Sequence, residues 1–243
     1  MRPFLLLSIR AEPEAAEEER DAFTRLLEVG SAGLERRELG ATALGRVDLD
    51  RWSGIVLGGG AFCISDPEAT KTIQQRCAEE DLAVVLDQVV AADFPFLGAC
   101  YGIGTLGRHQ GGVVDRSYPE PVGPLSVTVS AEGASDPLFA GLPQTFSAYG
   151  GHKEALAVVP DSATVLATSA ACPVQAFRVG ANVYATQFHP ELDLEGIRTR
   201  IAVYAGHGYF DPAEVVALQT AAAAVQVDHP GLLLRNFARL HAR

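Results

Sequence analysis

The stretch Phe94-Pro-Phe-Leu-Gly-Ala-Cys100-Tyr-Gly102 decides the fold. A short apolar run ends in a cysteine, with small residues directly before it and a glycine two places after it. This is the pattern Gly-x-nucleophile-x-Gly, in which a strand turns sharply into a helix and small neighbours prevent clashes in the turn. We therefore expect Gly98, Ala99 and Gly102 to leave Cys100 alone at the tip of the turn.

Such a turn places Cys100 at the N-terminus of a helix, where unpaired N–H groups and the helix dipole favour an anion. A cysteine attacks as the thiolate, and a protonated histidine nearby also favours that form. Taken alone, however, a buried cysteine at a strand end is more often a packing residue. A catalytic role for Cys100 therefore requires a base elsewhere in the chain.

A second apolar run supplies this base. Val183-Tyr-Ala-Thr-Gln-Phe-His189-Pro-Glu191 delivers a histidine and, two residues later, a carboxylate. A cysteine nucleophile needs a base that takes its proton and a third group that orients the base. Pro190 stiffens the link, so both side chains can lie at the end of one strand. Without the upstream cysteine these residues would suggest a solvated turn; together the two segments predict a triad of Cys100, His189 and Glu191.

Length and composition limit the class of protein. A chain of 243 residues can form one α/β domain with a full core, and 48% hydrophobic with 20% charged residues is typical of soluble globular proteins. The net charge is −11, and nucleic acid is bound through clustered Lys and Arg, so we expect no nucleic-acid partner. No apolar run approaches the ~20 residues of a membrane span. Residues 4–9 pass straight into an acidic stretch, which favours a buried strand over a signal peptide, and we expect a cytoplasmic protein that binds no membrane.

The remaining cysteines and histidines give no sign of a metal site. The four cysteines have no CxxC spacing, so we expect reduced thiols, most of them in the core, and neither a metal nor a cofactor. They are Cys63, Cys77, Cys100 and Cys172. Four histidines are expected to be surface or capping residues without a catalytic role: His109, His207, His229 and His241.

Strands alternate with helices in the first half of the chain. The pattern predicts strands at residues 3–9, 36–39, 54–57 and 94–98, and helices at 14–29, 67–91 and after Cys100. This order favours a parallel sheet covered by helices on both faces, with ligands at the carboxyl ends of the strands. Gly58-Gly-Gly60 and Cys100 both fall at such ends.

The second half of the chain changes pattern twice. Alternating runs at 125–129, 164–168, 174–179 and 182–187 predict further strands, the last two joined by a hairpin turn at Gly180-Ala181. Residues 194–243 are predicted to be mostly helical, with a helix start at Asp211-Pro212 and a break at 228–231. No repeat or linker interrupts the chain, so we expect one domain over residues 1–243.

Three motifs occur in a fixed order: Ser53-Gly-Ile-Val-Leu-Gly58-Gly-Gly60, Gly98-Ala-Cys100-Tyr-Gly102 and Gln187-Phe-His189-Pro-Glu191. With them the chain resembles class I glutamine amidotransferases, close to the glutaminase half of GMP synthase, over about residues 45 to 193. The resemblance implies a flavodoxin-like three-layer α/β/α sandwich with a mostly parallel central sheet. It also implies hydrolysis of the glutamine side-chain amide through a thioester, giving glutamate and ammonia for a separate synthetase.

The expected chemistry needs donors for an oxyanion. The backbone N–H of Tyr101, the residue after the nucleophile, is the natural first donor, and Gly59 or Gly60 is expected to supply the second. The triplet is not a phosphate loop, because no Lys-Ser/Thr pair follows it. By resemblance, His152 in Tyr149-Gly-Gly-His152-Lys-Glu154 corresponds to the histidine of the family's Ser-His-x-Asp stretch, which lines the glutamine pocket. A strand-end polar residue is an equally good interpretation of His152.

The chain departs from the family pattern at several points. Gly104 stands where the family usually has a glutamine that contributes to substrate binding, and Ala61 replaces the usual proline. The ATP-pyrophosphatase domain of GMP synthase is not found, so we expect the acceptor enzyme to be another chain. Two alternatives stay open: a stand-alone hydrolase of another γ-glutamyl amide, and a non-catalytic relic of the family.

Residues 194–230 have no counterpart in the family and are rich in alanine. Leu194, Ile197, Ile201 and Tyr204 recur at helical spacing, which predicts an apolar face that must be covered. The segment is expected to form either an added helical layer on the sheet, or a cap or subunit contact beside the active site. The second interpretation includes a homodimer.

Overall fold

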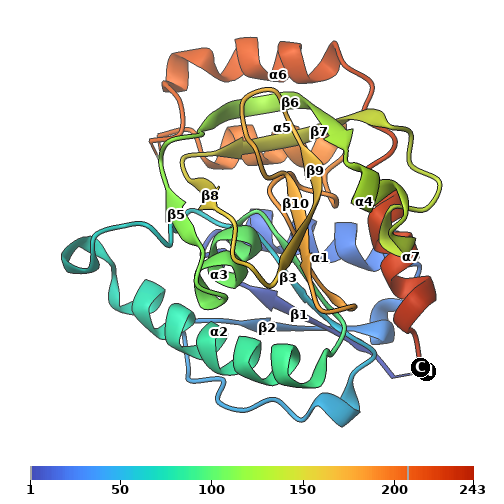
Figure 1. Ribbon diagram of the computed structural model, residues 1–243. Coiled ribbons are helices and arrows are strands. Elements are labelled where there is room, and N and C mark those ends of the chain that lie inside the picture. The colour runs from blue at the N-terminus through green and yellow to red at the C-terminus, as the bar shows by residue number, and fades with distance from the viewer. Residues whose placement is uncertain (1, 207) are drawn as a thin grey trace.

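A computed structural model describes residues 2–206 and 208–243, so His207 lies outside the described residues. A nine-stranded sheet in the order β2-β1-β3-β4-β11-β10-β9-β6-β7 runs through the molecule, and β5 and β8 form a separate pair (Figure 1). The strands are β1 (Phe4–Ser8), β2 (Leu34–Glu38), β3 (Ile55–Leu57), β4 (Phe96–Ala99), β5 (Val113–Asp115), β6 (Glu120–Val129), β7 (Thr145–His152), β8 (Ala155–Val158), β9 (Ala163–Thr168), β10 (Ala176–Val179) and β11 (Val183–Thr186). The α-helices are α1 (Pro13–Leu26), α2 (Ile73–Ala92), α3 (Tyr101–His109), α4 (Ala131–Ala134), α5 (Leu194–Val203), α6 (Val215–Ala223) and α7 (Gly231–His241).

The sheet has a parallel half and an antiparallel half. Strands β2, β1, β3, β4 and β11 are paired in parallel, whereas β10, β9, β6 and β7 continue the sheet through antiparallel pairs. The hairpin between β10 and β11 turns at Gly180, which has a φ of 60°. The predicted α/β fold with a mostly parallel central sheet and this hairpin are confirmed.

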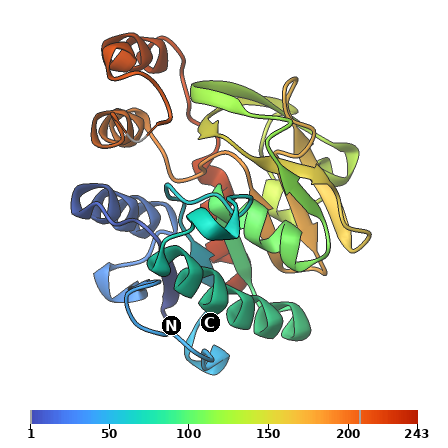
Figure 2. The same cartoon turned by 90° about the vertical axis from the view of Figure 1, so that its left-hand side faces the viewer.

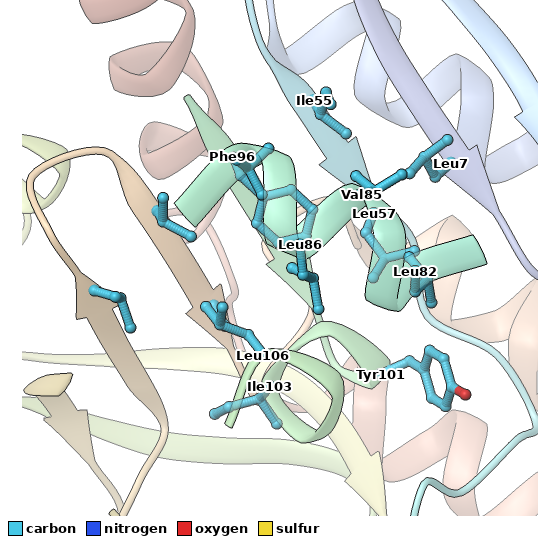
Figure 3. Packing of buried hydrophobic residues seen from close by; sticks show 14 of the residues in the cluster. Leu7, Ile55, Leu57, Leu82, Val85, Leu86, Phe96, Tyr101, Ile103 and Leu106 are labelled. Atoms are coloured by element: carbon cyan, nitrogen blue, oxygen red, sulfur yellow. The ribbon is translucent and has the colours of Figure 1, made fainter. Parts of the chain in front are cut away.

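Helices cover both faces of the parallel half because the strand residues alternate between two apolar clusters. Leu5 and Leu7 of β1 face α2 and α3, and Phe4 and Leu6 face α1 and α7. On the first face, side chains of α2 and α3 interdigitate with those of β1, β3 and β4 (Figure 3). This packing fixes the start of α3, and with it Cys100, against the carboxyl ends of the central strands.

The segment 194–230 forms the helices α5 and α6, joined through a short 3-10 turn, Pro212–Glu214, that Asp211 caps. In Figure 2 these two helices, coloured orange to red, are stacked beside the blue helix α1. They build a cluster of their own, in which Ile197 and Ile201 pack with Tyr149 of β7. The helices and the helix start predicted for this segment are therefore present, and they cover the expected apolar face.

Some boundaries differ from the prediction. The helix predicted from residue 67 begins only at Ile73, because the hydroxyl of Thr72 accepts a hydrogen bond from the Gln75 N–H at 3.1 Å and caps the helix there. Strands β5, β7 and β8 were not predicted: β7 contains a glycine pair and lacks a clear apolar alternation. Within the described part of the chain, no helix is long and apolar enough to cross a membrane.

Candidate active site

Cys100 lies in the turn between β4 and α3, as the sequence predicts. Its backbone has φ 52° and ψ −84°, a conformation that costs a non-glycine residue about 1–3 kcal/mol and that tends to occur at functional sites. The Cys100 N–H donates to the carbonyl oxygen of Thr186 in β11 at 2.7 Å, which ties the turn to the neighbouring strand. The thiol side chain is partly exposed, so a substrate can reach it.

The glycines around the turn have different reasons to be there. A Cβ added to Gly98 would lie 2.7 Å from the Cα of Gly102, so strand and helix can approach this closely only with glycine at position 98. At Gly102 the nearest atom to such a Cβ, a methyl of Leu57, is 3.7 Å away, an ordinary contact. The expectation that small residues are needed around the nucleophile therefore holds for Gly98 but not sterically for Gly102.

His189 and Glu191 follow β11, the strand beside β4. The His189 N–H donates to the carbonyl of Tyr149 at 3.0 Å, and its ring Nδ1 is 2.7 Å from the Oε1 of Glu191. The Glu191 side chain is completely buried. Because Nδ1 is engaged by the carboxylate, Nε2 is the ring nitrogen left for Cys100, with which His189 makes a side-chain hydrogen bond. The three residues predicted as a triad are thus brought together.

The charges of these groups depend on one another. Burial alone would lower the pKa of His189, but the negative charges of Glu191 and Cys100 outweigh it and raise this pKa to about 10. Burial would raise the pKa of Glu191, yet the charges of His189 and Arg10 lower it below its ordinary value. The arrangement therefore favours a protonated His189 ring beside an ionised Glu191 carboxylate.

The glycine triplet lies against the site with no room for side chains. A Cβ on Gly59 would be 2.6 Å from Cε1 of His189 and 3.3 Å from Cβ of Cys100. A Cβ on Gly60 would be 2.6 Å from the Ile9 side chain, and one on Gly58 would be 2.4 Å from the Glu19 carboxyl group. At Gly59 the backbone can approach the nucleophile and the base this closely only because the residue has no side chain, whereas side chains at Gly58 and Gly60 would collide with Glu19 and Ile9.

A hollow that is open to solvent lies over these groups. Cys100 and His189 line it together with Gly60 and Gly151, and the insertion contributes side chains from α5 and from the loop that follows. The residues from this segment are Ile197, Arg200, Tyr204, Tyr209 and Phe210. The loop is attached to the glycine triplet by a hydrogen bond of 3.2 Å from the Tyr209 hydroxyl to the carbonyl of Gly60. The cap predicted as one alternative for the insertion agrees with this placement, and a homodimer stays a prediction.

His152 lies apart from this hollow. Both of its ring nitrogens are engaged, Nδ1 with the carbonyl of Glu154 at 2.8 Å and Nε2 with Oε2 of Glu120 at 2.9 Å. The ring lines an adjacent hollow together with Lys153 and Tyr209. Its role in substrate binding therefore remains a prediction.

Glu120, His152 and Cys172 are close enough to hold a metal ion, with donor atoms within 4.8 Å of one another. Their donors already have partners in the protein, however. Glu120 accepts hydrogen bonds from Ser169 and Gln175 and contacts Nε2 of His152, and the Cys172 thiol donates to a backbone carbonyl. The cluster is thus explained by its own hydrogen bonds.

The sequence did not indicate the charged groups behind the triad. Arg10 lines the hollow, and its Nε is 2.7 Å from Oε1 of Glu19 in an ion pair that is almost completely buried. Its Nη1 donates to the hydroxyl of Tyr204 at 2.9 Å. Glu19 stands in a run of acidic residues that is typical of an exposed helix face, so its sequence context gave no signal for this buried ion pair.

We expect Gly59→Ala to disable the site without unfolding the protein. The new methyl group would overlap the ring of His189, which Glu191 holds in place, so the base must move away from Cys100. The rate of Cys100 alkylation by iodoacetamide should fall at least tenfold, while the thermal midpoint changes little. Gly102→Ala is the matched control, since a methyl group fits there; equal rates for the two variants would contradict this account of the triplet.

Comparisons with known proteins agree with the motifs and the fold. The family Glutamine amidotransferase class-I matches residues 45–202. The chain is 35% identical over 148 residues to one of the subunits of the glutamine-hydrolyzing GMP synthase of Thermoplasma acidophilum, covering 60% of this chain and 66% of that one. It is 33% identical over 115 residues to a glutamine-hydrolyzing GMP synthase of Thermosipho africanus, covering 47% of this chain and only 22% of that protein. These matches therefore span less than two thirds of the relatives' own lengths.

Solved structures share the fold. A glutamine amidotransferase from Thermotoga maritima superposes with a TM-score of 0.76 at 20% identity, covering 100% of both chains. A glutamine amidotransferase from Methylobacillus flagellatus superposes with a TM-score of 0.70 at 18% identity, covering 98% of this chain and 94% of that one. The region that the family matches includes the glycine triplet, Cys100, His189 and Glu191. The chain belongs to the class-I glutamine amidotransferase family.

Proposed function

We propose that the protein is a glutaminase that hydrolyses the side-chain amide of glutamine and delivers ammonia to a separate synthetase. The observation that carries this proposal is the arrangement of Cys100, His189 and Glu191 at the carboxyl ends of adjacent strands, with Nδ1 of His189 2.7 Å from the Glu191 carboxylate. The names of the relatives speak for glutamine rather than for another γ-glutamyl amide. The intact site speaks against a non-catalytic relic.

The proposed reaction begins with the thiolate of Cys100. Its sulfur attacks the carboxamide carbon of glutamine, and the C–N bond breaks as Nε2 of His189 donates a proton to the departing ammonia. Neutral His189 then takes a proton from a water molecule, whose oxygen attacks the thioester carbon. The C–S bond breaks, glutamate leaves, and the thiolate of Cys100 and protonated His189 are restored. Glu191 keeps the His189 ring oriented throughout and stabilises its cationic form.

The negative oxygen of each tetrahedral intermediate needs fixed donors. The N–H of Tyr101 lies in the first turn of α3, where it has no partner within the helix. The backbone at Gly59 and Gly60 faces the same hollow. We assign the oxyanion to the Tyr101 N–H and one N–H of this glycine pair.

A separate chain is proposed as the ammonia acceptor. The relative from Thermoplasma acidophilum is named as one subunit of a GMP synthase rather than as the whole enzyme. A second relative named in this way, from Methanococcus maripaludis, is 31% identical over 140 residues, covering 57% of this chain and 64% of that one. In the proposed arrangement this chain supplies ammonia to a partner, and the partner determines the chemistry of the acceptor.

A labelling experiment and a product assay together test the proposal. The purified protein is incubated with a diazo-ketone analogue of glutamine, and the modified peptide is identified by mass spectrometry; we expect modification at Cys100 that excess glutamine prevents. Glutamate and ammonia released from glutamine are then measured, and we expect equal amounts. Labelling elsewhere, or labelling that glutamine does not slow, would overturn the assignment.

Two departures from the family pattern lie in contact: Gly104, and Glu154, which stands at the aspartate of the family's Ser-His-x-Asp stretch. A Cβ added to Gly104 would lie 3.1 Å from Oε1 of Glu154 and 3.0 Å from the Ile64 side chain. The Glu154 carboxylate accepts hydrogen bonds from the backbone N–H groups of Ile64 and Ser65, at 2.8 Å each. The acid at position 154 thus lies so close to position 104 that a side chain there would press against its carboxylate.

We therefore expect Gly104→Gln alone to lower stability, because its side chain must displace a carboxylate that caps two backbone N–H groups. Loss of such hydrogen bonds to a charged group costs about 1.5–3 kcal/mol each. The double variant Gly104→Gln/Glu154→Asp should recover part of this loss and lower the Michaelis constant for glutamine. Thermal unfolding and steady-state kinetics check both parts; a single variant as stable as the double one would show that the two positions are independent.

A further inference from the structure

Arg10 is held in a fixed position between helix α1 and the candidate active site. It is 5% exposed, its Nε is 2.7 Å from Oε1 of Glu19, and its Nη1 donates to the Tyr204 hydroxyl at 2.9 Å. Glu19 is fully buried and also accepts a hydrogen bond from Ser8 at 3.0 Å. Three elements, namely β1 with its following loop, α1 and the end of α5, therefore hold one guanidinium group.

The remaining nitrogen of Arg10 lies beside Gly59, the glycine that borders the nucleophile and the base. Nη2 lies 3.3 Å from the point where a Cβ of Gly59 would be, and this same point is 3.3 Å from Cβ of Cys100 and 2.6 Å from the His189 ring. Arg10 also lines the hollow that Cys100 and His189 share. A guanidinium that served only to neutralise Glu19 would not need to present an edge to this hollow.

The charge of Arg10 offsets negative charge in the site. Glu191 is completely buried, and its Oε2 has no hydrogen-bond partner among the described residues. Arg10 is, after His189, the second cation that favours the ionised form of Glu191. Without Arg10, the completely buried Glu191 carboxylate would depend on the His189 ring alone, and that ring is also the group that serves Cys100, which is costly in a buried site.

We propose that Arg10 is a positioning residue of the active site: a fixed cation that stabilises the negative charge of Cys100 and of Glu191, anchored by Glu19 and by Tyr204 of the insertion. The proposal rests on the proposed function, because it assigns Arg10 to the same triad. It also gives the insertion a role in the chemistry, since Tyr204 is at the end of α5 and orients the guanidinium.

Other ionisable groups act on the same site and must stay constant in the test. Arg200 of α5 forms two ion pairs. Its Nη1 is 3.8 Å from Oε1 of Glu19, and its Nη2 is 2.7 Å from Oε2 of Glu18. Burial raises the pKa of Glu18 to about 7, so this group titrates within the range of the measurement. The other groups that face Arg10 or Cys100 are Glu12, which accepts a hydrogen bond from Tyr204, and Tyr209, Glu191 and His189.

The test is the pH dependence of Cys100 alkylation by iodoacetamide, followed peptide by peptide in the full-length protein. Arg10→Gln removes the cation, so the profile should move to higher pH and the rate at pH 7 should fall about tenfold or more. Glu19→Gln removes an anion from the same ion pair, so the profile should stay or move to lower pH. Opposite directions are expected only if the charge of Arg10 acts on the site, because a purely structural ion pair would respond alike to loss of either partner.

Two further comparisons protect the test against misfolding. Arg10→Gln leaves the buried Glu19 carboxylate without its partner. The double variant Arg10→Gln/Glu19→Gln is therefore compared with the single variant Glu19→Gln. Neither of these two proteins has the buried carboxylate, and they differ in the charge at position 10. Arg10→Lys should keep most of the wild-type rate because it keeps the charge. Arg235→Gln is the matched control, since it removes a cation of α7 from a half-exposed ion pair with Glu28 and should leave the profile unchanged.

Coincident profiles for wild type and Arg10→Gln, or shifts in the same direction for Arg10→Gln and Glu19→Gln, would overturn the proposal while leaving the triad intact. If wild-type Cys100 reacts no faster than Cys77 at neutral pH, the proposed function itself fails. The two failures are thus distinguishable in one data set.

Discussion

Cys100→Ala should abolish both glutamine hydrolysis and labelling by the diazo-ketone analogue while the protein remains folded. The proposed thioester cannot form without the sulfur, and removal of a nucleophile of this kind typically lowers the rate by a factor of about 10⁶. The partly exposed Cys100 side chain fills no core position, so the substitution should not cost stability. Alanine at position 100 would have to adopt the same strained backbone angles as the cysteine, so we expect only a slight change in the turn.

His189→Ala should have an effect of similar size, because the base and the nucleophile act as a unit. Cys77→Ala is the control: it removes a partly exposed cysteine on α2, away from the hollow, and should change neither activity nor labelling. Persistent labelling of the Cys100→Ala protein at another position, with wild-type turnover, would contradict the assignment of the nucleophile.

The parts of this site that follow from local sequence could be predicted. The strand–turn–helix at Cys100 depends on small residues within five positions, and the steric need at Gly98 is visible in the pattern itself. His189 and Glu191 are two residues apart, so their contact required only that β11 end beside β4, which the order of strands and helices favours.

The parts that depend on distant contacts could not be predicted. Arg10 and Tyr204 are 194 residues apart, and nothing in their local sequence indicates that they meet. Glu19 belongs to an acidic run that is typical of an exposed helix face, yet its side chain is fully buried because α5 and Arg10 cover it. Position 104 gives the opposite case, in which a glycine suggested a lost function until the nearby Glu154 explained the space.

The segment 194–230 connects the active site, whose motifs are local in sequence, with contacts between distant parts of the chain. Its helices cover α1 and β6, and the residues after α5 reach the hollow, where the Tyr209 hydroxyl donates to the Gly60 carbonyl at 3.2 Å. The ammonium of Lys153 lies 4.1 Å from the centre of the Tyr209 ring, which adds a cation–π contact between the insertion and the loop after β7. The family match ends at residue 202, within α5, so the residues that follow α5 add Tyr204 and Tyr209 to the wall of a site whose chemistry belongs to the family.

Glu191→Gln should give the second large loss of activity, about 10²- to 10⁴-fold in the rate of glutamine hydrolysis. Glutamine has nearly the same shape but no charge, so the His189 ring loses the anion that orients it. The pKa of His189, about 10 in the wild type, should fall, because burial lowers it and Glu191 is the main group that raises it. A neutral ring at pH 7 would no longer stabilise the thiolate.

The same variant should also change how stability depends on pH. The pKa of His189 is about 10 in the folded protein and 6.5 in its ordinary, unfolded environment. The protonated ring therefore stabilises the folded state fully below pH 6.5, and this contribution is lost as the pH rises to about 10. In Glu191→Gln this alkaline loss should be smaller, as measured by urea unfolding between pH 6.5 and 10. Asp87→Asn is the matched control, since Asp87 also contacts a histidine ring, that of His109, at 2.9 Å, but outside the hollow. A drop in activity for Asp87→Asn as large as that for Glu191→Gln would mean that the assignment of Glu191 as the orienting group is wrong.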